Sequence, residues 1–498
     1  MTKRTIISPP FSWEFRIAAL YVAYMLATPL YYLSFQNDFD EGFTAMKSAL
    51  MLHGYSLYRD IWNDQPPLLS YLLCTLWRVT GESILAGRAL ELFFAALLLW
   101  AGGKIVRNIC GEPHGIIATL LITQLLFFQF SSVTLTIGLP ALALAMCALL
   151  CVMEWGENQE KWRLYLAALL LILAALTKFI ALLLLPVMCA GIALSAWGNK
   201  ASSKKLTWLF LPALWATACV GILAALLFAF AGTSVMQQLI RPHILARNPA
   251  GLNVFYYQLY FFYPRLRWIY LLSLTSLPLL AMRRYRQLFY LVAWAALAFI
   301  VLKLHHPIRW HQHFLLTIPL ALLSGAGLGE FVRVARKTLS TRVQSTAVAA
   351  ALSCIIIASL TEGVAGLKQY FHLTSLFELQ SDSDTPINAH TNERAFKIVQ
   401  ELKRLAHGTL VVTDVPLLAL EAGSLVPPYL AVFSDERVQI GNLTEDIIIK
   451  IIKDTHPKAL LFGRFINNRF ATIHDSLLAL GYSTVNTVPN ADLYALEH

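Results

Sequence analysis

Apolar runs of transmembrane length recur along most of this sequence and constrain its fold more than any other feature. The hydrocarbon core of a bilayer is about 30 Å thick, so a spanning helix needs about 20 apolar residues. About eleven segments meet this requirement, near residues 17–35, 83–106, 115–133, 138–154, 163–177, 179–197, 207–231, 267–282, 287–304, 314–332 and 344–362. With 57% hydrophobic and 14% charged residues, the chain is predicted to be a polytopic α-helical membrane protein.

One apolar run, residues 163–197, is too long for a single span. As one helix it would measure about 50 Å at roughly 1.5 Å per residue. We predict a break at Thr177-Lys178, because a lysine in the middle of the bilayer would cost about 2.5–3.5 kcal/mol. At a turn on the outer interface, the same lysine can meet an anion. The shorter apolar segment 66–80 starts with prolines and is expected to be a helix at the outer surface.

Basic residues predict the orientation of the chain. They cluster before the first apolar segment and in every second loop after it, which by the positive-inside rule face the cytoplasm. The loop after the first span, the loops at 232–266 and near 305, and residues 363–498 then share the outer side. We expect an inner (plasma) membrane protein with a cytoplasmic N-terminus and a periplasmic or extracytoplasmic C-terminal domain. This topology explains the excess of Lys and Arg, so nucleic-acid binding is not expected.

Composition divides the chain into two predicted domains. Residues 1–363 form the transmembrane domain, whose first outer loop, 36–82, is the candidate catalytic segment, and residues 364–498 form a soluble domain. In the latter, helix-like and strand-like patterns alternate, with strands at 409–413, 458–462, 483–488 and 493–496 and helices at 395–405, from Pro416 and at 465–480. The alternation predicts a small α/β domain. Its charged candidates are expected to be ordinary surface residues: Asp414, Glu421, Asp435, Glu436 and Arg437.

The first outer loop begins with a predicted helix that carries two acids. Asp40 stands where an N-cap or first-turn residue would, and apolar residues then recur at helical spacing until Gly54. This pattern predicts a short amphipathic helix on the membrane. The helix dipole favours negative charge on Asp40 and Glu41 by about 0.3–1 kcal/mol, and an ionised carboxylate can accept a proton. Alternatively, Asp40 is simply a helix cap.

Several short motifs follow one another in order. They are Asp-Glu-Gly at 40–42, Gly-Tyr-Ser-Leu-Tyr-Arg-Asp at 54–60, Asp-Gln-Pro-Pro-Leu at 64–68, Arg88 at the second span, Leu-Thr-Lys at 176–178, and His313-Phe314 followed by Pro319. Over about residues 15–330 the chain resembles the protein O-mannosyltransferases and lipid A aminoarabinose transferases. These are membrane glycosyltransferases of the GT-C fold. The acidic motifs after the first span are the most specific part of the resemblance.

The resemblance implies an inverting hexosyl- or pentosyltransferase that takes its sugar from a polyprenyl-phosphate donor. Asp40 corresponds to the catalytic base, with Glu41 beside it, and Asp64 lies near the reacting centre. A base that activates the acceptor hydroxyl suits a single displacement. The leaving phosphate needs cationic or hydrogen-bonding partners. The candidates are Lys178, Arg88, Arg309, His313, His306 and Arg241.

Departures from the aminoarabinose transferases limit what can be carried over. In that branch a phosphate-binding lysine precedes Pro-Pro and an arginine follows Asp-Glu-Gly, whereas this chain has Gln65 and Phe43. A polar residue near the fourth span is also missing, where the chain reads Ile-Gly-Leu-Pro at 137–140. Phosphate must therefore be anchored by other residues. The acceptor stays open between a glycan, a lipid and a protein.

The histidine-rich loop 303–313 and Arg241 each allow more than one interpretation. The four histidines do not have the spacing of a standard zinc site, so no metal ligand is assigned, although a divalent metal as cofactor stays open. Arg309 and some histidines either bind phosphate or sugar, or are solvated beside an interfacial Trp310. Arg241 either contacts a lipid phosphate or faces anionic headgroups.

Two other classes of function compete with the transferase. A transporter or flippase for a lipid-linked substrate should have repeated halves or paired interrupted helices with ionisable residues at mid-membrane. The sequence shows no such repeat, and its acidic motifs lie at the outer surface. A non-enzymatic scaffold would not need Asp40, Asp64 and Lys178 to converge. No glycine-rich nucleotide-binding fingerprint follows a strand, so a nucleotide-sugar donor has no support.

Overall fold

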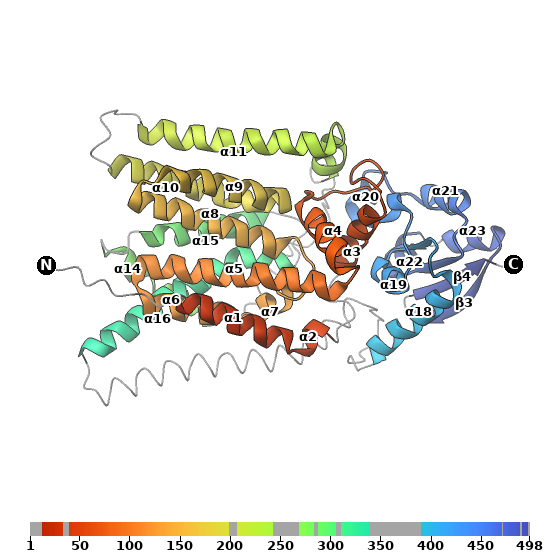
Figure 1. The fold of residues 1–498 in the computed structure, drawn as a ribbon, viewed down its shortest axis with the longest axis horizontal. Helices are drawn as coiled ribbons and strands as arrows, with labels where there is room; N and C mark the ends of the chain where they lie inside the picture. The colour runs from red at the N-terminus through yellow and green to blue at the C-terminus, as the bar shows by residue number, and fades with distance from the viewer. Residues whose placement is uncertain are drawn as a thin grey trace.

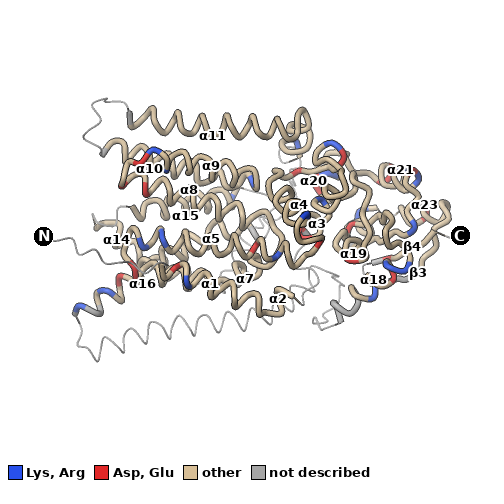
Figure 2. Tube along the Cα trace, in the orientation of Figure 1, with Lys and Arg blue, Asp and Glu red and all other residues tan. Residues whose placement is uncertain are grey.

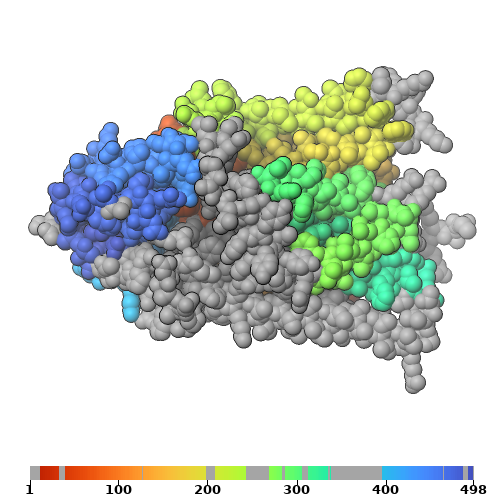
Figure 3. Space-filling model, turned by 180° about the vertical axis from the view of Figure 1, so that it is seen from behind, coloured from red at the N-terminus to blue at the C-terminus, as the bar shows by residue number. Residues whose placement is uncertain are grey.

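The computed structural model describes residues 12–32, 39–198, 207–242, 268–282, 287–304, 310–338, 390–470, 472–488 and 491–496. Within these residues a helical body and a C-terminal region with a small sheet follow one another along the long axis of the molecule (Figure 1). Seen from behind, the C-terminal region forms one end of the molecule (Figure 3). The predicted segment 344–362 and the predicted domain boundary at 363/364 lie outside the described residues.

Ten of the predicted apolar segments coincide with helices in the described residues. These helices are α1 (Trp13–Leu26), α2 (Pro29–Tyr32), α5 (Ile84–Cys110), α6 (Glu112–Thr123), α7 (Leu126–Ser131), α8 (Gly138–Asn158), α9 (Lys161–Thr177), η1 (Phe179–Leu184), α10 (Leu185–Gly198), α11 (Thr207–Ala231), α14 (Leu277–Leu280), α15 (Phe289–Leu304) and α16 (Phe314–Thr338). In the described part of the chain, 5 helices are long and apolar enough to cross a membrane. The count of about eleven spans stays a prediction.

The break predicted inside the 163–197 run is present. Helix α9 ends at Thr177, and Lys178 adopts an extended conformation with φ −157° and ψ 128°. A 3-10 turn, η1, then leads into α10. A residue in this conformation interrupts the i to i−4 ladder, so the lysine lies at a helix end rather than within a span.

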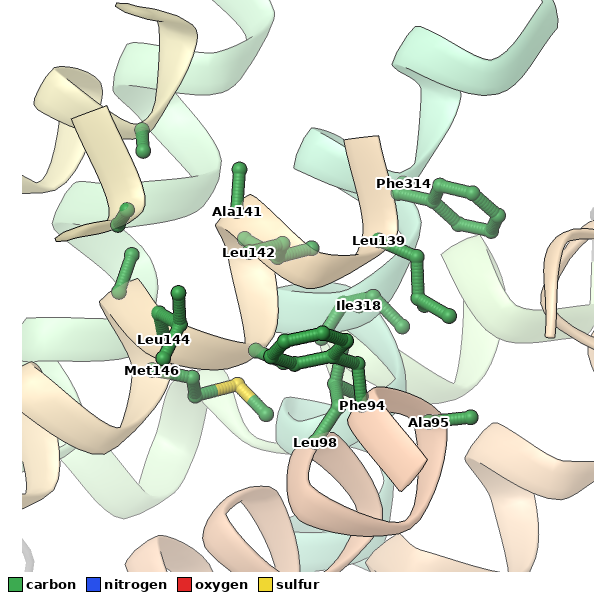
Figure 4. Close-up of a cluster of buried hydrophobic side chains, with 14 of the residues drawn as sticks. Phe94, Ala95, Leu98, Leu139, Ala141, Leu142, Leu144, Met146, Phe314 and Ile318 are labelled. Atoms are coloured by element: carbon green, nitrogen blue, oxygen red, sulfur yellow. The ribbon is translucent and has the colours of Figure 1, made fainter. Parts of the chain in front are cut away.

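The core of the helical body includes α8 and α16, most of whose apolar residues are buried. Side chains from α5, α8 and α16 meet there, among them Phe94, Leu98, Leu142, Met146 and Ile318 (Figure 4). Helices α6 and α16 approach so closely at Gly325 that an added Cβ would lie 2.5 Å from the Cα of Ala118. Small residues permit such close backbone packing, on which helix association in lipid depends.

Two helices of the first outer loop lie between the membrane helices and the C-terminal region (Figure 1). The amphipathic helix predicted from the sequence is α3 (Phe39–Leu52), and the surface helix predicted at 66–80 is α4 (Leu68–Thr80). The chain leaves α3 through Gly54 at φ 92°, a conformation that favours glycine. Both predicted helices are present, and they place the acidic motifs next to the C-terminal region.

The C-terminal region contains a four-stranded sheet in the order β1-β2-β4-β3. Its strands are β1 (Val411–Thr413), β2 (Ala459–Phe462), β3 (Tyr482–Val488) and β4 (Ala491–Leu496). Strands β1 and β2 are parallel, and the other pairs are antiparallel. The helices are α18 (His390–Ala406), α19 (Pro416–Glu421), α20 (Asp435–Gln439), α21 (Glu445–Thr455), α22 (Arg464–Arg469) and α23 (Ile473–Ala479). The predicted alternation is confirmed, but α20 and α21 were not predicted, and the helix predicted at 465–480 is divided into α22 and α23.

Two of the charged residues predicted to be on the surface of this region are buried instead. Asp414 follows β1, and its carboxylate accepts backbone N–H groups of Gly463 at 2.5 Å, Phe465 at 2.8 Å and Ile466 at 3.1 Å. It thereby caps α22, and burial raises the pKa of its carboxyl group. Arg437 in α20 is 0% exposed. The surface-charge prediction was therefore wrong for both residues.

Candidate active site

The C-terminal region packs directly on the helix that carries the acidic motif. Helix α19 lies against α3, and an added Cβ on Gly42 would be 3.2 Å from both the Cβ and the backbone N of Leu417. Phe43 packs against the apolar core of the C-terminal region. The glycine allows this close approach, and the phenylalanine stands where the aminoarabinose transferases have an arginine. In this chain the position serves packing between the two regions.

A buried ion pair fixes the start of α3. The guanidinium of Arg88 in α5 donates from Nε to Oε1 of Glu41 at 2.8 Å and from Nη2 to Oε2 at 2.9 Å. Both side chains are at most 1% exposed. Nη1 of Arg88 also donates to the carbonyl of Tyr31 at 2.9 Å. Arg88, a predicted phosphate ligand, is thus bound to Glu41, and the pair holds the residue next to Asp40 in place.

A lysine that the sequence interpretation overlooked lies near the predicted acids. Asp40 is partly buried and Asp64 is buried. Lys47, two helical turns after Asp40, is 5% exposed, and its Nζ donates to Oδ1 of Asn63 at 2.9 Å. Burial lowers the pKa of Lys47, while the charges of Asp64 and Asp40 raise it. The charges of both carboxylates therefore act on Lys47, so the two acidic motifs lie near the same lysine. The seven-residue spacing from Asp40 is the signal that could have identified it.

The loop between α3 and α4 is fixed by hydrogen bonds to its own backbone and to η2 (Val235–Ile240). The hydroxyl of Tyr58 and the amide of Asn63 donate to the carbonyl of Gln65 at 2.7 Å and 2.6 Å. From η2, the amide of Gln238 donates to the carbonyl of Tyr58 at 2.8 Å and accepts from the backbone N–H of Asn63 at 2.9 Å. The loop that carries Asp64 is therefore held from two sides.

The other predicted phosphate ligands in the described part of the chain lie at the ends of α9 and η2 and in the turn before α16. Lys178 is partly buried at the end of α9, and Arg241 is exposed at the end of η2. His313 is buried before α16, with its ring centroid 6.4 Å from that of Phe127. Burial lowers the pKa of His313 to about 4, so this imidazole is neutral at pH 7 and can form hydrogen bonds but carries no positive charge.

Two candidates, Arg309 and His306, lie outside the described residues. Among the residues that are described, no group of three or more His, Cys, Asp or Glu side chains could hold a metal ion. Metal binding by residues 305–309 therefore stays open, as it was from the sequence.

Comparisons with known proteins bear on the family and on the fold of this chain. Residues 64–224 match the family described as dolichyl-phosphate-mannose-protein mannosyltransferase. No curated protein sequence is significantly similar. ArnT from Cupriavidus metallidurans bound to undecaprenyl phosphate is similar in structure, with a TM-score of 0.63 and 14% identity over 96% of this chain and 97% of that one.

The oligosaccharyltransferase AglB from Archaeoglobus fulgidus is also similar. In complex with an inhibitory peptide and a dolichol-phosphate, it gives a TM-score of 0.55 and 13% identity over 98% of this chain and 74% of that one. The family matched and these structural neighbours are glycosyltransferases. The resemblance predicted from the motifs is therefore confirmed: the chain has the GT-C fold of membrane glycosyltransferases, and residues 64–224 carry the match to the mannosyltransferase family.

Proposed function

We propose that this protein is an inverting glycosyltransferase that moves a sugar from a polyprenyl-phosphate donor to an acceptor hydroxyl at the outer face of the membrane. The observation that carries the proposal is the arrangement of Asp40 and Asp64 around Lys47, with the neighbouring Glu41 locked by Arg88. ArnT was solved with undecaprenyl phosphate and AglB with dolichol-phosphate, which supports a lipid-phosphate donor for a chain of the same fold.

In the proposed reaction, Asp40 accepts the proton of the acceptor hydroxyl as its oxygen attacks the anomeric carbon. The bond from that carbon to the phosphate oxygen breaks, and the electron pair leaves with the lipid phosphate. General-base assistance of this kind contributes about 10²- to 10⁴-fold to a rate. The buried pair between Glu41 and Arg88 holds the start of α3, so Arg88 is assigned a positioning role for Asp40.

The charge that develops on the leaving phosphate requires cationic or hydrogen-bonding groups beside that phosphate. We assign Lys178 and Arg309 as cations and neutral His313 as a hydrogen-bonding partner, with His306 and Arg241 as further contacts. Asp64 is placed beside the reacting centre, where it faces Lys47. The acceptor is a glycan, a lipid or a protein. The residues described around Asp40 do not select among these three classes.

The proposed reaction takes place on the outer side of the inner (plasma) membrane. Most charged residues belong to the two ends of the helical body and to the C-terminal region (Figure 2). This distribution suits helices that cross a bilayer between two aqueous faces. The C-terminal region lies at the same end as α3 and α4 (Figure 1), so it shares a compartment with the acidic motifs in the proposed topology.

Replacement of Lys178 with alanine is expected to weaken the use of the donor. The KM for the polyprenyl-phosphate sugar should rise about tenfold or more, because a hydrogen bond to a charged group contributes about 1.5–3 kcal/mol. Acceptor preference should not change. Steady-state kinetics with varied donor test this prediction, with Lys161→Ala at the exposed start of α9 as the matched control. A changed acceptor preference with an unchanged donor KM would instead place Lys178 in the acceptor site.

A further inference from the structure

Arg437 combines complete burial with two hydrogen-bond donors that lack acceptors. Its guanidinium carbon lies 4.4 Å from the ring centroid of Trp62 and 4.4 Å from that of Tyr429. Nη1 donates to the carbonyl of Val432 at 2.6 Å. Nε and Nη2 are buried and form no hydrogen bond within the described part of the chain. Burial lowers the pKa of Arg437 to about 10, while Tyr429 and Asp64 raise it, so the side chain is charged at neutral pH.

A third donor without an acceptor belongs to the same contact. The indole Nε1 of Trp62 is buried and makes no hydrogen bond to any residue that the structure describes. Trp62 belongs to the first outer loop and Arg437 to the C-terminal region, so the donors come from both sides of the junction. Buried polar groups are normally satisfied. Three hydrogen-bond donors without a hydrogen-bonding partner at one junction therefore indicate a site for an oxyanion.

Lys47 adds a second cation beside this contact. Its Nζ donates to the side chain of Asn63, the residue after Trp62. The negative charge of Asp64 acts on both Lys47 and Arg437, so the two cations flank the same short stretch of loop, residues 62–64.

We propose that Arg437, Trp62 and Lys47 form an oxyanion subsite that binds the phosphate of the lipid-linked donor, and that the C-terminal region thereby completes the site. The inference rests on the proposed function, because it names ligands for the phosphate of that donor. Nε and Nη2 of an arginine form a planar pair of donors that matches two oxygens of one phosphate. Stacking between the rings of Trp62 and Tyr429 fixes the plane of the guanidinium group. An anionic group on the acceptor is the other source of the same chemistry.

Binding measurements on the full-length protein in zwitterionic lipid nanodiscs test the subsite. The probes are polyprenyl phosphate and uncharged polyprenol of the same length. For Arg437→Gln and for Lys47→Met, we expect the affinity for polyprenyl phosphate to fall about tenfold or more while the affinity for polyprenol is unchanged. The affinity of Arg437→Lys should be intermediate, because lysine keeps the positive charge but lacks the planar pair of N–H donors. Arg469→Gln, at an exposed arginine paired with Asp435 of α20, is the control and should bind as the wild type does.

A second measurement keeps the test valid if a variant is less stable. The rise in Tm on addition of polyprenyl phosphate is recorded for each variant relative to its own ligand-free Tm, and it should shrink for Arg437→Gln and persist for Arg469→Gln. Wild-type affinity for polyprenyl phosphate in Arg437→Gln would overturn the subsite. If Arg437→Gln bound polyprenyl phosphate normally but lost turnover only with anionic sugar acceptors, the bound anion would belong to the acceptor. This result would also overturn the proposed phosphate subsite. Failure of the wild type to bind polyprenyl phosphate would instead contradict the proposed function.

Discussion

Replacement of Asp40 with asparagine is expected to abolish sugar transfer while the protein stays folded. Asparagine has almost the same shape and can still lie in the first turn of α3, but its amide cannot take the proton of the acceptor hydroxyl. Loss of a general base lowers a rate by about 10²- to 10⁴-fold. The measurement is the rate of sugar transfer by purified variant and wild type with a polyprenyl-phosphate sugar, together with Tm in detergent.

The matched control for this variant is Asp60→Asn. Asp60 lies in the same outer loop, where its carboxylate binds Arg59 at 2.9 Å and the backbone N–H of Ser56 at 2.8 Å. Its replacement should leave the transfer rate within a few-fold of wild type, because an exposed ion pair contributes little to the stability of the fold. Full activity of Asp40→Asn would remove Asp40 as the base and favour its interpretation as a helix cap.

Separate replacement of either member of the Glu41–Arg88 pair is expected to be the most destabilising change in the outer half of the protein. Arg88→Met leaves the carboxylate of Glu41 buried without its main partner, and Glu41→Leu does the same to the guanidinium. Removal of one partner of a buried ion pair costs about 3–5 kcal/mol. The double variant Glu41→Leu/Arg88→Met removes both charges and should recover much of this loss. Thermal unfolding of the three variants in one detergent measures the coupling.

Transfer activity should not follow stability in this series. The double variant is expected to regain Tm but to stay less active than wild type, because the residue beside Asp40 no longer has its fixed contact with α5. Arg59→Gln, which breaks an exposed pair, is the control and should change neither quantity appreciably. Additive losses of stability in the double variant would show that the two side chains do not act as a pair.

The sequence predicted those features that depend on local pattern. Hydropathy located α5, α8 and α16, and helical spacing located α3 and its end at Gly54. The break at Lys178 followed from a comparison of the length of the apolar run with the thickness of a bilayer. Most of the alternation of strands and helices in the C-terminal region was also recognisable, although α20 and α21 were not predicted.

The partners of the charged residues could not be predicted in the same way. Arg88 meets Glu41 across 47 positions of sequence, and Arg437 meets Trp62 across a far larger separation. Nothing in the local pattern around Arg437 distinguishes it from a surface arginine, because its burial comes from the docking of α20 on the outer loop. Lys47 was overlooked for a different reason: its helix was predicted, but only the apolar face of that helix was considered.

The proposed function is tested most directly by incubating the purified protein with a panel of polyprenyl-phosphate sugars and measuring the release of polyprenyl phosphate in the presence of hydroxyl acceptors. The wild type should consume at least one donor of the panel, and Asp40→Asn should consume none. Sugar transfer from a nucleotide sugar with no consumption of any polyprenyl-phosphate sugar would contradict the proposal, as would equal consumption by wild type and Asp40→Asn.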